Sequence, residues 1–90
     1  LTKDCIYAEE RTWDRRLNGA YSRLRSQLAD EKTRASLDAM QQRWIKYRDA
    51  RCDFYFVAGG EGTASRVSAA NCLLELTVSK TVELESLIHD

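Results

Sequence analysis

Apolar residues recur every three or four positions along most of the chain, which is the period of an amphipathic α-helix. Three such stripes predict helices over residues 2–28, 31–57 and 64–88. Residues 73–78 could also form a strand, because β-branched side chains weaken helix propensity there, but the helical period continues beyond them. The main stripe positions are Ile6, Trp13, Leu17, Ala20, Tyr21, Leu24 and Leu28, then Leu37, Met40, Trp44 and Tyr47, then Val67, Ala70, Leu74, Thr77, Thr81 and Leu84.

Signals for helix ends fall between these stripes. Asp30 is a good N-cap for the second helix, and Thr63 or Ser65 would cap the third. The chain has no proline, and three of its four glycines lie within residues 59–62, where a glycine can end the second helix in the left-handed conformation. The fourth, Gly19, is interpreted as tolerated within the first helix rather than as a close helix contact.

Short connections between helices imply antiparallel neighbours. We therefore predict an all-α fold, an up-down-up three-helix bundle that forms a single domain over residues 1–90 and is stapled by a disulfide. The aromatic residues Trp13, Tyr21 and Phe54 are expected in the core. Helix two cannot bury all of residues 54–56 on one stripe, so one of these aromatic side chains is expected to be exposed or to cover the loop.

The composition excludes several classes of protein. Ninety residues with fourteen basic and fourteen acidic side chains have a formal net charge of zero, which argues against nucleic-acid binding. The longest run without a charged residue, 67–74, is too short to span a membrane. No stretch resembles a signal peptide, so we expect that any such leader has been removed or was never there. The acidic third helix could face a basic partner, although pairing with the basic helices of its own bundle is favoured.

The three cysteines, at positions 5, 52 and 72, suit a disulfide better than a metal site. No CxxC motif is present and the single histidine, His89, lies near the chain end, so no metal or cofactor is expected. Cys52 and Cys72 lie at nearly the same level of an antiparallel helix pair, which favours a bridge between them, but Cys5 lies at the same end and Cys5–Cys52 stays open. A disulfide would indicate export, and three reduced thiols in a cytosolic bundle are the alternative.

Catalytic chemistry is not indicated, and we expect no enzyme activity. The lone imidazole is poorly placed to serve any nucleophile. The glycine-rich segment 59–63 lacks the lysine and the preceding strand of a phosphate-binding loop. The segment from Trp44 to Asp49 contains Trp, Tyr and Arg, which are typical of interface hot spots, but core packing of Trp44 and a helix-to-helix tie through Arg48 or Asp49 are favoured.

An ordered series of short motifs runs through the chain. It consists of Leu17-Asn18-x-x-Tyr21, Gln41-x-x-Trp44-x-x-x-Arg48-Asp49-x-x-Cys52, Gly59-Gly60, Cys72-Leu73-x-x-Leu76-Thr77 and Glu83-Leu84. The series covers about residues 5–87 and resembles the lysozyme inhibitor LprI-like N-terminal domain family of exported bacterial proteins. One departure is the basic residue that often follows Leu-Thr in this family, which appears here one turn later as Lys80.

The resemblance implies a periplasmic or secreted domain in which Cys52 pairs with Cys72. It also implies that the chain binds and inhibits a lysozyme-type muramidase, and an exposed loop could block the enzyme's cleft. The alternative is an envelope protein-interaction or structural module with no effect on lysozyme. The candidate contact residues are Gly59, Gly60, Glu61, Gly62 and Thr63, whereas the motif residues with an expected structural role are Leu17, Asn18, Tyr21, Gln41, Trp44, Arg48, Asp49, Leu73 and Thr77.

Overall fold

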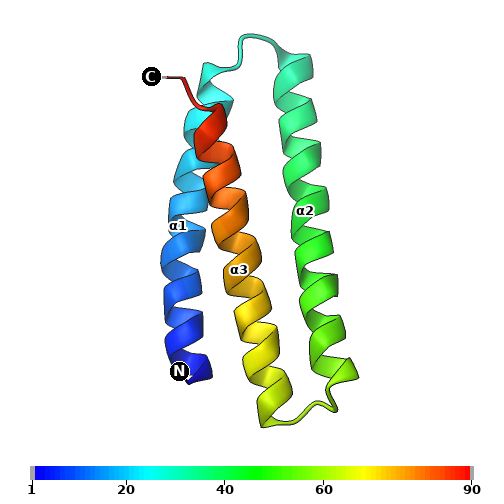
Figure 1. The fold of residues 1–90 in the computed structure, drawn as a ribbon. Coiled ribbons are helices and arrows are strands. Elements are labelled where there is room, and N and C mark those ends of the chain that lie inside the picture. The colour runs from blue at the N-terminus through cyan, green and yellow to red at the C-terminus, as the bar shows by residue number, and fades with distance from the viewer. Residues whose placement is uncertain (1, 90) are drawn as a thin grey trace.

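A computed structural model describes residues 2–89, which form three helices and contain no strand. Helix α1 spans Lys3–Gln27, α2 spans Glu31–Ala58 and α3 spans Thr63–Leu87. Figure 1 shows the chain running up α1, down α2 and up α3. The predicted up-down-up bundle is therefore confirmed, and each helix boundary lies within one residue of its predicted position. Residues 1 and 90, the ends of the predicted domain, lie outside the described part of the chain.

Local capping explains where α1 and α2 begin. The Thr2 hydroxyl accepts a hydrogen bond from the Cys5 amide, and the Asp30 carboxylate accepts one from the Thr33 amide at 2.7 Å. Asp30 is thus the N-cap that the sequence predicted. For α3 the prediction of Thr63 or Ser65 was wrong, because its N-cap is Gly62, which has no side-chain hydrogen bond. Thr63 is already helical, and Ser65 is buried.

Helix α3 occupies the centre of the bundle. It packs along both α1 and α2, whereas α1 and α2 approach each other much less closely. The Cα atoms fill a flat rod of 47 × 21 × 14 Å. Figure 1 accordingly shows α2 as one edge of the molecule, with α1 and α3 side by side on the other. Within residues 2–89, no other helix therefore covers the outer side of α2.

The main apolar core lies near the α1–α2 connection. Its buried members come from all three helices, and partly buried side chains, including Tyr21 and Trp44, pack around them. Nearer the α2–α3 loop the interior is richer in small and polar side chains, and the disulfide joins α2 to α3 there. The buried members of the main cluster are Leu17, Ala20, Leu24, Leu37 and Leu84.

Two expectations about individual residues can be compared with this packing. A Cβ atom added to Gly19 would meet nothing within 4 Å, so its interpretation as a tolerated glycine is confirmed. The placement of Phe54 in the core was wrong, because its side chain is 64% exposed. Tyr55 is also exposed and Phe56 is only partly buried, so this aromatic run exposes two rings rather than one. Phe54 lies on the side of α2 away from Cys52, which faces α3.

Candidate functional site

The α2–α3 loop is a tight turn that ends α2 in a Schellman motif. The Gly60 amide donates to the carbonyl of Val57 at 3.1 Å, and the Glu61 amide donates to that of Phe56 at 3.0 Å. Gly60 has a φ of 94°, the left-handed conformation that the glycine cluster predicted. Glu61 has a φ of 63°, which is uncommon for a residue with a side chain. The turn therefore holds an exposed acidic residue at one end of the rod.

Close packing explains the glycine at position 59. A Cβ atom there would collide with the hydroxyl of Ser65 and would lie 3.1 Å from the carbonyl oxygen of Tyr55. Ser65 is itself buried at the start of α3, so it has little room to move. Gly59 thus lets α3 begin close to the end of α2, whereas a Cβ atom at Gly62 would meet nothing within 4 Å.

The five candidate contact residues, 59–63, are all exposed and form one continuous end of the molecule. Gly59 and Gly60 have conformational or packing reasons to be glycine, as shown above. Glu61 and Thr63 remain as the exposed loop positions whose side chains the fold does not bury, whereas Gly62 has no side chain and is the N-cap of α3. Glu61 and Thr63 are therefore the exposed side chains of this loop.

The disulfide joins Cys52 of α2 to Cys72 of α3, and the two Cα atoms are 5.5 Å apart. Both residues are buried, whereas Cys5 is a free, exposed thiol. The pairing of Cys52 with Cys72 is therefore confirmed. The two alternatives, a Cys5–Cys52 bridge and three reduced thiols, are wrong.

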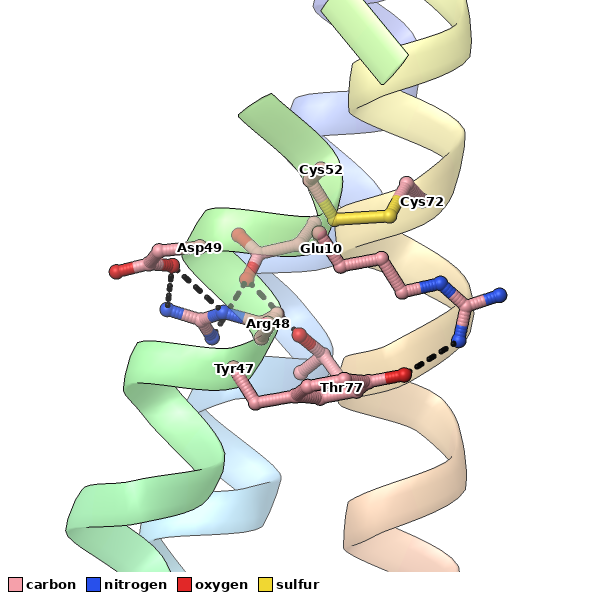
Figure 2. The surroundings of a disulfide bond; sticks show 8 residues. Glu10, Tyr47, Arg48, Asp49, Cys52, Cys72 and Thr77 are labelled. Atoms are coloured by element: carbon pink, nitrogen blue, oxygen red, sulfur yellow. Dashed lines mark hydrogen bonds and ion pairs between the residues drawn. A yellow bond between two sulfur atoms is a disulfide. The ribbon is translucent and has the colours of Figure 1, made fainter. Parts of the chain in front are cut away.

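Beside the disulfide, charged and polar side chains from all three helices meet (Figure 2). The Arg48 guanidinium donates to Asp49 at 3.0 Å and lies 4.0 Å from the carboxylate of Glu10 on α1. The Thr77 hydroxyl of α3 donates to the same Glu10 carboxylate at 3.3 Å. The Arg48 and Glu10 side chains are each only 15% exposed, whereas Asp49 is 58% exposed, so this cluster links the helices from a partly buried site.

Sequence reasoning found Arg48, Asp49 and Thr77 but missed Glu10. The only available signal was its position in the first helix. Glu10 lies four residues after Ile6 and three before Trp13, so it shares a helix face with apolar residues. A carboxylate at such a position needs a partner when it is buried, and Arg48 supplies it.

Other motif residues of α2 face α3 between this cluster and the α1–α2 connection. The ring of Trp44 lies near two cations, with its centroid 5.0 Å from the Arg48 guanidinium carbon and 5.9 Å from the Lys80 ammonium. Lys80 is only 7% exposed and pairs with Glu83 at 2.9 Å. Gln41 is also buried, and within the described residues its side-chain oxygen has no hydrogen-bond partner. The displaced basic residue of the motif series therefore lies inside the fold.

Motif residues of α1 connect it to α2 near their connection. Leu17 is in the core, while Asn18 is exposed and donates to Asp14 at 3.5 Å. The Tyr21 hydroxyl donates to the Asp38 carboxylate, which also accepts from Arg25 at 3.0 and 3.1 Å. Hydrogen bonds from Arg25 and Tyr21 lower the pKa of the Asp38 carboxyl below its ordinary value, and the bond to Asp38 raises the pKa of Tyr21.

The acidic residues of α3 differ in their partners. Glu85 pairs with Arg16 of α1 through two hydrogen bonds of 2.6 and 2.8 Å, and the bond to Arg16 lowers the pKa of the Glu85 carboxyl. The C-terminal part of α3 therefore pairs with the basic helix α1 of the same bundle. Glu75, by contrast, has no ion pair within residues 2–89, and neither has Glu61 in the loop.

The surface beside the disulfide is hollowed. A groove of about 340 Å³ lies on the side facing α1, and its wall contains two carboxylates, Asp49 and Asp53, together with Tyr7, Phe56 and Arg66.

Residues 2–89 contain no group of three or more histidine, cysteine or acidic side chains that could hold a metal ion. In the same part of the chain, no helix combines the length and apolar character needed to cross a membrane.

These observations define a class of protein, a small all-α domain in which one disulfide joins two of three antiparallel helices. The chain belongs to the family described as lysozyme inhibitor LprI, whose model matches residues 2–84. It is also 33% identical over 54 residues to an uncharacterised protein of Rhizobium meliloti (strain 1021). That match covers 60% of this chain but only 39% of the Rhizobium protein. No solved structure matches the chain.

Proposed function

We propose that this domain binds a lysozyme-type muramidase outside the cytoplasm and inhibits it by inserting the α2–α3 loop into the substrate cleft. The observation that carries this proposal is membership of a family described as lysozyme inhibitors, with a match that spans almost the whole chain. A protein inhibitor needs no catalytic machinery of its own. It needs a rigid surface that excludes the enzyme's substrate.

The shape of the loop end supports this mode of binding. The molecule is 47 Å long but only 21 and 14 Å across, so its end is narrow enough to approach a cleft. The Schellman turn fixes the path of the loop, which lowers the conformational entropy that binding would otherwise cost. Glu61 is exposed at this end and has no ion pair among the described residues, so it is free to meet a partner.

The distribution of charge also supports the loop end of the molecule as the contact surface. The half of the bundle nearer the loop, residues 2–14 and 46–75, contains eight acidic and six basic side chains. The chain as a whole is neutral, so this half carries a modest negative charge that the other half balances. A negative end accelerates encounter with a basic enzyme more than it strengthens the final complex.

The disulfide supports the proposed location. Bridges of this kind persist in the periplasm and outside cells, whereas the cytosol keeps thiols reduced. The Cys52–Cys72 bond is buried between α2 and α3 and is therefore a structural bond rather than an exposed redox centre. We accordingly place the working protein in the periplasm or in the extracellular medium.

An activity assay tests the proposal directly. Lysozymes of several types are mixed with equimolar and excess protein, and hydrolysis of cell-wall material is followed over time. We expect inhibition by the native chain and at least a tenfold weaker effect for Glu61→Arg, which reverses the charge of the loop. Glu75→Arg is the matched control, because it reverses another unpaired carboxylate on the middle of α3.

The outcomes separate the parts of the proposal. Full activity of every lysozyme at micromolar excess of the native chain would refute inhibition altogether. Equal inhibition by the native chain and Glu61→Arg would retain the activity but move the contact away from the loop. The groove beside the disulfide, which contains Asp53, would then be the next surface to vary.

A second candidate is an interaction module for another envelope protein. The specific observation in its favour is that the Rhizobium relative is much longer than the region it shares with this chain. A domain that recurs within a longer protein can serve to attach it to a partner, because one fold supports several functions. Recovery of one defined non-muramidase partner from periplasmic extract, bound again in purified form by the native chain but not by Glu61→Arg, would favour this candidate.

A further inference from the structure

Helix α2 has a second stripe of mostly apolar residues, which lies outside the main core. Its residues are spaced alternately three and four positions apart, which is the 3.5-residue period of a coiled-coil seam. The core-facing residues of α2, such as Cys52 and Gln41, lie on a different side of the helix. We call this stripe the outer seam, and it consists of Arg43, Tyr47, Ala50, Phe54 and Val57.

The outer seam is open to solvent. Tyr47, Phe54 and Val57 are 56%, 64% and 54% exposed, and Arg43 and Ala50 are exposed as well. Figure 1 shows α2 at the edge of the molecule, with α1 and α3 on its other side. Since an aromatic side chain offers about 150–250 Å² of surface, Tyr47 and Phe54 together leave roughly 200 Å² of mostly apolar area in water. That area is available to a partner helix.

Charged residues beside the seam select its partner. Lys46 and Asp53 are seven residues apart and therefore flank the seam on the same side. Both are exposed, and neither has an ion pair within the described chain. In an antiparallel pair of α2 helices, Lys46 of each copy would lie beside Asp53 of the other. A parallel pair would instead bring Lys46 next to Arg51, which repels it.

The register set by these two ion pairs also matches the seam residues to one another. Tyr47 then lies opposite Ala50 of the second copy, so a large ring meets a small side chain. Phe54 lies opposite Arg43, a pair that can make a cation–π contact. Both pairs are complementary, and the two-fold symmetry repeats each contact.

We infer that two copies of this chain associate through the outer seams of α2, packed antiparallel about a two-fold axis. The seam from Arg43 to Val57 is about 21 Å long at the rise of an α-helix. A contact of this length is at the small end of specific interfaces, so we expect a dissociation constant in the range of about 1–100 µM. The dimer goes beyond the proposed inhibition and is measured without any lysozyme.

Sedimentation of the whole chain, oxidised at Cys52–Cys72, tests the inference at concentrations from about 1 µM to 1 mM. The native chain should shift from monomer to dimer across this range, and Phe54→Glu should remain monomeric. Because Phe54 is 64% exposed, this variant should keep its fold, which circular dichroism verifies. The matched control is Val82→Glu on α3, which replaces a different exposed apolar residue, 54% exposed, and should dimerise normally.

Charge reversal tests the antiparallel register. Lys46→Asp or Asp53→Lys alone should weaken dimerisation at least tenfold, since each places like charges together twice. The double variant Lys46→Asp/Asp53→Lys should restore it. A native chain that stays monomeric throughout, or a dimer that survives Phe54→Glu, overturns the interface, and failure of the double variant to restore dimerisation overturns the register.

Discussion

Loss of the Cys52–Cys72 disulfide is expected to remove a large part of the stability of this domain. The two cysteines are separated by 20 residues, and the chain-entropy model assigns about 3 kcal/mol to the closure of a loop of that length. A domain of this size has a total free energy of unfolding of about 5–13 kcal/mol. The disulfide therefore contributes about a quarter to more than half of the total free energy of unfolding.

Loss of the disulfide should destabilise one half of the bundle more than the other, in addition to lowering the overall stability. The main apolar cluster lies near the α1–α2 connection, whereas the cysteines lie in the half that ends at the α2–α3 loop. That half has fewer large buried side chains to hold α2 against α3. Without the bridge, the end of α2 and the start of α3 should exchange their amide hydrogens faster than the opposite end of the bundle.

The assay compares the native chain with Cys52→Ala/Cys72→Ala in guanidinium unfolding followed by circular dichroism. Thermal unfolding should show a decrease in Tm of about 12–24 °C, given about 4–8 °C per kcal/mol for a small domain. Cys5→Ala is the control, because this thiol is free and exposed, and it should change stability by less than about 0.5 kcal/mol. A double variant within about 1 kcal/mol of the native chain would refute the reasoning.

Three further changes have defined expected results. Gly19→Ala should raise the free energy of unfolding by about 0.5–1 kcal/mol, because the added Cβ atom meets nothing within 4 Å. Gly59→Ala should lower it by about 1–3 kcal/mol, because its Cβ atom would collide with the Ser65 hydroxyl. Arg25 lowers the pKa of Asp38, so this contribution to stability is present above the unfolded pKa near about 4 and is lost as the pH falls through the lower folded value. Asp38→Asn should therefore lessen the decrease in stability measured by denaturant unfolding at successively more acidic pH.

Controls distinguish these effects from nonspecific damage. Gly62→Ala adds a Cβ atom at the other side of the loop, where nothing lies within 4 Å, so it should be nearly neutral. Equal losses for Gly59→Ala and Gly62→Ala would contradict the packing argument at Gly59. An unchanged acid profile in Asp38→Asn would show that Glu85 and Asp30, whose pKa values are also lowered, dominate the acid response.

The helices were predictable because their signals are local. A period of 3.6 residues, the Asp30 cap and the glycines near residue 60 each act within about one turn of helix, so sequence alone located the boundaries to within one residue. The cap of α3 was not predictable in this way. Its position depends on Ser65 packing against Gly59, which is a contact between two helices rather than a local preference.

Tertiary placement was the harder part of the candidate site. Apolar spacing put Phe54 in the core, but α2 carries two apolar stripes and only one can face α3. Glu10 was missed because a single charged residue on an apolar face has no visible partner until α1, α2 and α3 are brought together. Its partner Arg48 is 38 residues away in the sequence, so no local pattern could pair them.

The two proposed surfaces are separate, which allows each to be tested without the other. The outer seam ends at Val57 and the loop begins at Gly59, and in an antiparallel dimer the two loops would point to opposite ends. Glu61 lies about 12 residues beyond the two-fold axis along α2, or about 18 Å, so the loops would be about 36 Å apart. A dimer should therefore bind two enzymes with equal affinity. Phe54→Glu should retain inhibition per chain, and Glu61→Arg should retain dimerisation.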